Sequence, residues 1–257
     1  MTLAGVLGFL EKGGVKTTHV LKNCKLYYGG HDLSGDLNQI TLEYGAAEKD
    51  ATTFGNDSEV VLAGLKRVSL NHQGFVNQGT DGGIDLSSFD AIGDAEENVT
   101  VCPVSGADGE IAFCLKDILT AYNPGGAIGD VYAFTVSGRG AGDLIRGTVM
   151  AAGAKTSTAN GTVRQLGAVL ATQRVYAMLH VVAASGTNPT LDVVVESDDA
   201  ADMVGATERI AFTQATAIGS ELKSAAGAIT DDRWRVRWTI GGTNTPTFTF
   251  IVIVGIQ

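Results

Sequence analysis

Gln39-Ile40-Thr41-Leu42-Glu43-Tyr44 is the stretch that decides the fold class, because apolar and polar side chains alternate along it. Successive side chains of a β-strand point to opposite faces, so its three apolar residues are expected on one face of a sheet. The stretch belongs to a longer segment that begins at Asp32-Leu33-Ser34-Gly35, and a second short strand is expected after Gly64-Leu65. The segment therefore predicts paired strands.

A second alternating stretch, Arg233-Trp234-Arg235-Val236-Arg237-Trp238-Thr239-Ile240, lies near the C-terminus. Its four apolar residues would face a core, and its three arginines would share the opposite face of the strand. Residues 241–246 have the composition of a turn, and residues 247–254 follow as a strand that becomes apolar on both faces. The pattern predicts a β-hairpin whose second arm is buried on both sides.

Further strands are expected where short apolar or β-branched runs lie between turn residues. They are expected at residues 98–104, 110–115, 131–136, 174–183 and 190–196. Helical periodicity is scarce: residues 84–92 predict one short helix and residues 198–203 a single helical turn, while residues 143–150 fit a strand or a helix. The sequence thus predicts an all-β fold, a β-sandwich with one or two short helices.

Two stretches rich in small residues, 137–142 and 151–161, have the composition of turns or linkers. They divide the 257 residues into an N-terminal arm (1–22), a first β-sandwich (23–142), a linker (143–161) and a second β-sandwich (162–257). The two halves share no convincing residue-level identity, so an internal duplication is a structural hypothesis and not a sequence observation.

The chain carries 28 acidic and 18 basic residues, a formal net charge of −10. Such a chain repels phosphate at long range, so we expect no specific binding of nucleic acid. The N-terminus lacks a basic start and no apolar run approaches about 18 residues, so neither a signal peptide nor a membrane span is expected. Cys24, Cys102 and Cys114 have no metal-ligand spacing and are expected to be reduced thiols of a cytosolic product.

Motifs of enzyme chemistry do not occur in the sequence. The four histidines are scattered, and neither a Gly-x-Ser-x-Gly motif nor a Cys/His pair with an orienting carboxylate can be assigned. Lys12-Gly13-Gly14-Val15-Lys16-Thr17-Thr18 resembles a phosphate-binding loop, but its lysine follows the paired glycines too soon. The sequence therefore predicts a protein that is not an enzyme and has no cofactor or metal.

The segment from Asp32 to Phe75 resembles the tail-tube (major tail) proteins of long-tailed, non-contractile bacteriophages. Those proteins carry the pattern D-[IL]-S-G…N-x-[IV]-x-L…T-T-F-G…GL…G-F. The matching residues are Asp32-Leu33-Ser34-Gly35, the strand at 39–44, Thr52-Thr53-Phe54-Gly55, Gly64-Leu65 and Gly74-Phe75. The resemblance covers residues 24 to about 77, and beyond them only the β-content and the C-terminal Trp/Arg pattern are similar.

The resemblance implies a virion structural protein of the tail, made in the cytoplasm of a host bacterium, that acts by assembly. In that family a β-sandwich flanked by a short helix forms rings, and hairpins of successive subunits join into a β-barrel around a channel for DNA ejection. Its partners would be further copies of itself, other tail proteins at the tube ends, and DNA that passes without specific binding. Two alternatives stay open: two tandem tube domains in trimeric, pseudo-hexameric rings, or a hexameric ring decorated by the second half.

Three sets of residues are candidate sites. The long polar loop 45–57 is expected to dock into the next ring through Glu48, Lys49, Asp50, Thr52, Thr53, Phe54 and Asp57. Acidic side chains lining the bore would keep DNA sliding, and the candidates are Glu43, Asp192 and Glu196. The arginine row, Arg233, Arg235 and Arg237, requires acidic partners, either Asp192 and Glu196 within the sheet or an acidic neighbouring subunit.

Two other classes of function fit the same pattern: a capsid decoration or tail-tip structural protein, and a β-sandwich module that binds a ligand such as a carbohydrate. A carbohydrate module should expose aromatic side chains on a sheet face. Trp234 and Trp238 share a face whose other members are aliphatic, so burial in a core is expected for both.

Overall fold

The computed structural model describes residues 21–77 and 84–257, and nearly all regular structure in this part of the chain is β-strand. The all-β prediction is therefore confirmed. The expected N-terminal arm, residues 1–22, lies almost entirely outside the described residues. The strands are β1 (Lys25–Tyr28), β2 (His31–Asp32), β3 (Leu37–Asp50), β4 (Val61–Phe75), β5 (Glu97–Cys102), β6 (Ile111–Gly125), β7 (Ala133–Gly140), β8 (Ile145–Lys155), β9 (Ala159–Asn160), β10 (Arg164–Gln165), β11 (Arg174–Asp198), β12 (Thr207–Ala211), β13 (Gly219–Ala226) and β14 (Arg233–Ile256). The predicted helix at 84–92 is α1 (Ile84–Asp90).

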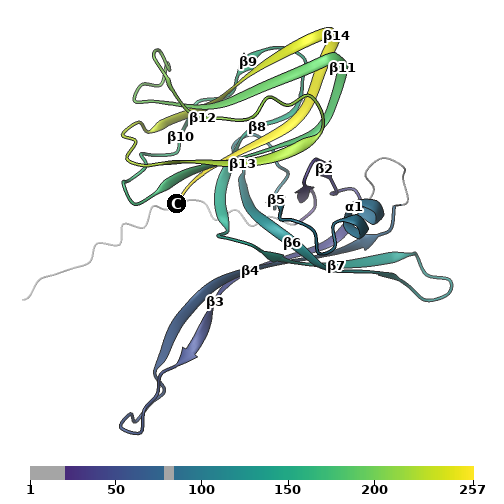
Figure 1. Ribbon diagram of the computed structural model, residues 1–257, viewed down its shortest axis with the longest axis vertical. Helices are drawn as coiled ribbons and strands as arrows, with labels where there is room; N and C mark the ends of the chain where they lie inside the picture. The colour runs from purple at the N-terminus through teal and green to yellow at the C-terminus, as the bar shows by residue number, and fades with distance from the viewer. Residues whose placement is uncertain (1–20, 78–83) are drawn as a thin grey trace, which may run out of the picture.

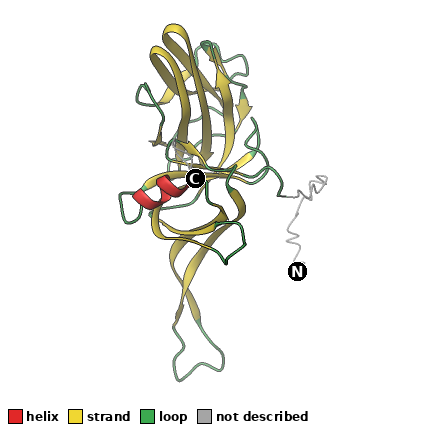
Figure 2. Ribbon diagram, turned by 90° about the vertical axis from the view of Figure 1, so that its right-hand side faces the viewer, coloured by secondary structure: helices red, strands yellow, loops and turns green. Residues whose placement is uncertain are grey.

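The strands form one antiparallel hydrogen-bonded network that folds into several layers (Figures 1 and 2). Its main path runs β12-β11-β14-β8-β6-β5-β1-β2, and β7, β4 and β3 branch from β6 in that order. In Figure 1, β3 and β4 form a long hairpin that projects from the body, and β6 and β7 form a shorter one. The network thus consists of a layered body with two projecting hairpins.

Apolar side chains gather in two main cores. The first lies among β1, β4, β5, β6 and β7 and includes Leu26, Leu70, Val99, Leu115 and Val136. The second lies among β8, β11 and β14 and includes Met150, Val193, Trp234, Phe248 and Phe250. A smaller cluster around Cys114, Ile145, Met178 and Ile251 draws on strands of both groups and fills the space between them.

The long strands β11 and β14 pair along their whole length, with Val175 opposite Ile256 at one end and Asp198 opposite Arg233 at the other. Register shifts between residues 181 and 190 coincide with a bend of this two-stranded ribbon, which Figure 1 shows at the upper right. Because of this bend, aromatic side chains from the two halves of β14 meet in the core, with 5.7 Å between the ring centroids of Trp238 and Phe250.

The predicted hairpin of residues 233–254 is therefore wrong. Both of its arms are hydrogen-bonded to β11, and they face one another across the core instead of pairing. The break predicted between strands 174–183 and 190–196 belongs to the same bend, because backbone pairing with β14 continues through it. Alternation in the sequence identifies which side chains are buried, but it does not identify the partner strand.

The small-residue stretch at 137–142 and the predicted linker at 143–161 are largely strand, so the turn composition at 137–142 and 151–161 was misleading, whereas residues 143–150 are mostly strand, one of their two predicted alternatives. β7 continues to Gly140, and β8 occupies most of the second stretch, where it pairs with β6 and β14. Small residues are needed because the strands approach closely: a Cβ on Gly147 would lie 2.7 Å from Cγ2 of Ile253. The helical turn predicted at 198–203 is also wrong, because these residues form the end of β11 and non-helical turns.

His180 fastens the second group of strands to the first. Its Nδ1 lies 2.6 Å from the carbonyl oxygen of Gly29, and its Nε2 lies 2.8 Å from Oγ1 of Thr100 on β5. Burial lowers the pKa of His180 to about 4, so the ring is neutral at pH 7. Nδ1–H then donates to the Gly29 carbonyl, and Nε2 must accept from the Thr100 hydroxyl. Both ring nitrogens of this buried side chain are thus satisfied.

Replacing Thr100 by valine removes the hydroxyl donor and keeps the shape of the side chain. Nε2 of His180 then lacks a donor, and an unsatisfied buried polar group costs about 1–3 kcal/mol. We expect Thr100→Val to lower the free energy of unfolding by this amount in urea denaturation. Thr162→Val, at an exposed position, is the matched control, and equal stability of the two variants would contradict the role of His180.

Candidate assembly site

The β3–β4 hairpin is the most prominent feature outside the body (Figures 1 and 2). Its strands pair from Leu37 opposite Gly74 to Asp50 opposite Val61. The loop predicted at 45–57 is therefore wrong in its bounds, because β3 continues to Asp50 and the connecting loop is residues 51–60. A solvated, polar two-stranded ribbon has the composition of a loop, so the ladder could not be read from the residues alone.

The loop at the end of the hairpin is held by its own hydrogen bonds. The backbone N–H of Thr52 donates to Oδ1 of Asp50 at 2.8 Å, and that of Val60 donates to Oγ1 of Thr52 at 2.9 Å. Thr53 donates to Oδ1 of Asn56 from its backbone N–H at 3.0 Å and from its hydroxyl at 2.7 Å. Hydrogen bonds from Thr52 lower the pKa of Asp50. The tip is thus a preformed turn although its side chains are exposed.

The predicted docking residues fall on two parts of this hairpin. Glu48, Lys49 and Asp50 are the last residues of β3, whereas Thr52, Thr53, Phe54 and Asp57 lie in the loop, and all seven are exposed. The structure therefore brings them together at one end of the molecule.

Large apolar side chains are exposed along the same hairpin. Phe54 at the tip is fully exposed, Leu65 is 87% exposed, and Leu62, Val61 and Tyr44 are each about half exposed. Several exposed apolar groups on one projecting ribbon are typical of protein–protein contact surfaces. The predicted docking residues included Phe54 but not Leu62 or Leu65, although Gly64-Leu65 is one of the motifs that carry the family resemblance.

The outer face of the sheet β3-β4-β7-β6 is polar, with two uncharged rows followed by a third that carries Glu43, Ser69 and Arg139. The two uncharged rows can be followed through the register of the four strands. The first row is Gln39, Gln73, Thr135 and Asn123, and the second is Thr41, Asn71, Ser137 and Ala121. The opposite face packs on the first core through Leu70 and Val136. The polar residues alternate along each strand with the buried ones, so this face could have been predicted from the sequence, but the candidate sites did not include it.

The three acidic residues predicted to line a bore do not share a face. Glu43 lies on the polar face of β3, where it accepts a hydrogen bond from Ser69 at 3.3 Å. Asp192 and Glu196 lie on β11, and Asp192 accepts hydrogen bonds from Gln214. Glu196 is only 5% exposed, so its proposed place on a channel wall is wrong. Charge and strand position alone did not reveal that this carboxylate is buried.

The arginine row is paired within the chain. Arg235 and Arg237 donate from Nε to the two oxygens of Glu196, at 2.8 and 2.6 Å. Nε of Arg233 lies 3.4 Å from Oδ1 of Asp232. Asp192, the other predicted partner of the arginines, instead accepts hydrogen bonds from the side chain of Gln214. Burial acts to raise the pKa of Glu196, but the hydrogen bonds and charges of the two arginines outweigh it and lower that pKa. This ionic cluster is a structural element of the second group of strands.

Replacing Glu196 by glutamine leaves two guanidinium groups without their carboxylate. We expect the free energy of unfolding at pH 7 to fall by about 1–3 kcal/mol. Because the folded-state pKa lies below the unfolded one, this stabilisation is present above about pH 4.5 and is lost as the pH falls through the folded value. The difference between the two proteins should therefore shrink in acid. Asp192→Asn is the control, and a pH-independent difference for Glu196→Gln would contradict the assignment.

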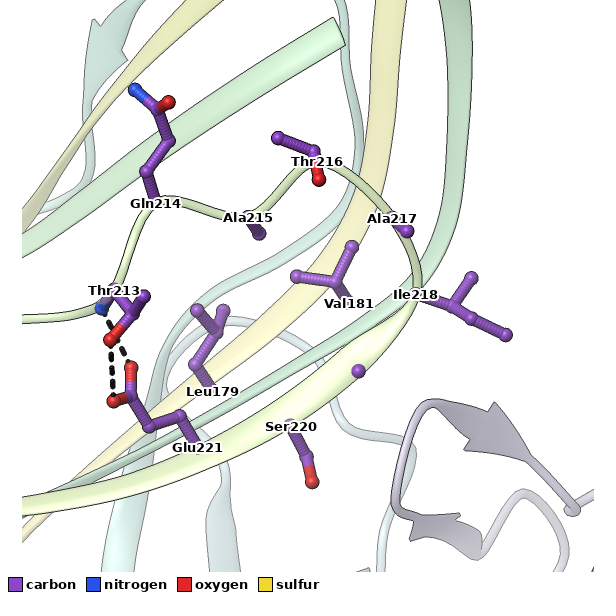
Figure 3. A pocket seen from close by; sticks show the side chains of 11 residues that line it. Leu179, Val181, Thr213, Gln214, Ala215, Thr216, Ala217, Ile218, Ser220 and Glu221 are labelled. Carbon is purple, nitrogen blue, oxygen red and sulfur yellow. Dashed lines mark hydrogen bonds between the residues drawn. The ribbon is translucent and has the colours of Figure 1, made fainter.

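A concave site of another kind lies on the second group of strands (Figure 3). Its floor is formed by Leu179 and Val181, and its rim by residues 213–221. The one carboxylate in this lining, that of Glu221, already accepts hydrogen bonds from the backbone N–H and the hydroxyl of Thr213, at 2.7 and 2.9 Å. No aromatic side chain lines this described site, so it lacks the stacking surface that carbohydrates bind.

The two tryptophans are buried, as expected. Trp234 and Trp238 are at most 5% exposed, and their indole N–H groups donate to the carbonyl oxygens of Gly167 and Ser157. Over residues 21–77 and 84–257, no three His, Cys, Asp or Glu side chains are grouped so that they could hold a metal ion. In the same part of the chain, no helix has the length and apolar character needed to cross a bilayer.

Comparison with known proteins finds similar solved structures only at low identity. No family model and no curated protein matches the chain. A chain of the virion of the native gene transfer agent particle is 16% identical, with a TM-score of 0.35, over 46% of this chain and 92% of that one. Another similar chain belongs to the sheath–tube complex, in its extended state, of the extracellular contractile injection system PVC. It is 10% identical, with a TM-score of 0.42, over 52% of this chain and 95% of that one.

The SPP1 Dit protein, described as a hub adsorption apparatus of phages that infect Gram-positive bacteria, is 12% identical. The match covers 92% of this chain and 100% of that chain, with a TM-score of 0.38. These neighbours come from a virion, an injection-system tube complex and a phage hub, all with TM-scores below 0.5.

Proposed function

We propose that this protein is a structural component of a phage tail and that it polymerises into stacked rings that form the tail tube, a channel for DNA ejection. The observation that carries this function is the sheet β3-β4-β7-β6, which is open at both edges. Among the described residues, β3 pairs with β4 only, and the end of β6, from Thr120 to Gly125, pairs with β7 only. Each copy therefore offers an unpaired strand on either side of one sheet.

Addition of β3 of one copy beside the end of β6 of the next satisfies both open edges. Such a contact joins two different surfaces, so its repetition closes a ring when the rotation between copies divides a full turn. A closed ring of sheets is a β-barrel, which has no unpaired edge. The apolar, core-packed face of each sheet then lies on the outside, and the rows of amides and hydroxyls around Asn71 and Ser137 line the bore. Uncharged polar groups let DNA pass without specific binding.

The β3–β4 hairpin supports stacking of these rings. It projects beyond the four-stranded sheet and carries the exposed side chains of Phe54, Leu62 and Leu65, which become buried if the hairpin packs on the next ring. Interfaces of permanent assemblies bury on the order of 2,000 Å² or more, and a ribbon of this length contributes a large part of that area. Within the described residues each copy has one such sheet, which favours a hexameric ring with residues 162–257 as an outer β-sandwich.

Shortening the hairpin tests the stacking role. Asp50 and Val61 are opposite each other, so residues 51–60 can be replaced by Asn-Gly, the preferred two-residue turn. In negative-stain electron microscopy we expect the unaltered protein to form long tubes and the shortened variant to stop at rings or monomers. Because the removed tip is exposed, the melting temperature of the shortened variant as a monomer should equal that of the unaltered protein.

Phe54→Leu, which keeps an apolar side chain at the tip, is the control and should still form tubes. Normal tubes from the shortened variant would show that the hairpin tip has no part in stacking. Single rings from the unaltered protein under all conditions would instead favour a tail-tip protein, whose ring is not repeated along an axis.

A further inference from the structure

A groove with a positively charged lining lies at the base of the β3–β4 hairpin. β7 ends at Gly140, and at this point the four-stranded sheet narrows to the two strands of the hairpin. The groove has a volume of about 870 Å³ and is lined by Leu65, Lys66, Arg67, Arg139, Gly140 and Asp143, among others. Three cations and one carboxylate give it a net positive charge in a chain whose net charge is −10.

These cations have no carboxylate partner among the described residues. Lys66, Arg67 and Arg139 are exposed, and in this part of the chain none of them forms an ion pair. Lys66 lies over the ring of Tyr44, with 5.9 Å from Nζ to the ring centroid. The arginines of β14, by contrast, are all paired with acidic side chains. The charges of the groove are thus available to another molecule.

The tip of the hairpin has the opposite charge. Residues 48–59 contain four acidic residues, Glu48, Asp50, Asp57 and Glu59, and one cation, Lys49, and all five side chains are exposed. None of them forms an ion pair within residues 21–77 and 84–257. The tip therefore presents an excess of three negative charges on a preformed turn.

Asp57 and Glu59, at the end of the tip, cannot reach Lys66 and Arg139 of their own chain, whereas Glu48 lies beside the groove residue Ala47. The strand from Val61 to Arg67 spans about 20 Å at 3.3 Å per residue, and it is held straight by pairing with β3. A second copy, displaced along the hairpin by at least this length, brings its groove to the tip of the first. A contact between two different surfaces that repeats by translation along an axis gives a filament.

We infer that the acidic tip of each copy binds the basic groove of a copy in the next ring, and that these charges set the axial register of the tube. This inference rests on the proposed tube function and adds the surface that receives the hairpin. Asp57 and Glu59 at the tip and Lys66 and Arg139 in the groove are the complementary charges. Because they lie at the surface, added salt weakens their attraction.

Charge reversal followed by mixing tests the pairing. Lys66→Glu with Arg139→Glu reverses the groove, and Asp57→Lys with Glu59→Lys reverses the tip. We expect each double variant alone to need about tenfold more protein, or still more, to form tubes, measured by sedimentation and electron microscopy. An equimolar mixture should assemble at the concentration of the unaltered protein, because each reversed tip then meets a reversed groove.

Asp94→Lys with Asp108→Lys, two exposed acidic residues away from the hairpin, makes the same change of net charge as the tip reversal and should leave tubes intact. Normal assembly of the reversed-groove variant, or a mixture that fails although both variants melt like the unaltered protein, would overturn the pairing and leave the tube function standing. Failure of the unaltered protein to form any tube would overturn the proposed function, and this inference with it.

Discussion

The open backbone edge of β3 is the constraint on which the rest of this structure depends. A strand edge leaves N–H and C=O groups available to any other chain, and proteins normally protect long edges with proline, lysine or a covering element. β3 has 14 residues, contains no proline, and carries its one lysine, Lys49, next to the tip. The end of β6 is open in the same sheet. In the proposed assembly, another copy completes this edge.

The body of the protein gives this edge a fixed orientation. The first core holds the wide end of the sheet through Leu70 and Val136, while the second group of strands is closed around its own tryptophans and the buried pair of Glu196 with Arg235. His180 connects the two groups by hydrogen bonds that leave neither ring nitrogen unsatisfied. Stability is thus concentrated in the body, and the surfaces available for assembly lie on a ribbon that adds little to it.

The all-β fold, the strand at 39–44 and the helix at 84–92 could be predicted from the sequence, because each depends on local periodicity. The strand that pairs with β14 could not be predicted, because alternation indicates that Trp234 and Trp238 are buried but does not indicate that β11 is the partner. The glycines of β8 looked like a linker, although they allow close packing of strands. For the candidate site, the position of Phe54 was predicted, but the basic groove required the register that brings Arg139 beside β4.

Hydrogen exchange of the β3 amides tests the central claim most directly. Amides of β3 that point away from β4 have no partner among the described residues of a single copy, so they should exchange rapidly in the dissociated protein. In the assembled protein, pairing with a neighbouring copy should slow the same amides by orders of magnitude, while those already bonded to β4 change less. Equally fast exchange of the outward amides in both states would contradict closure of this edge by a second copy.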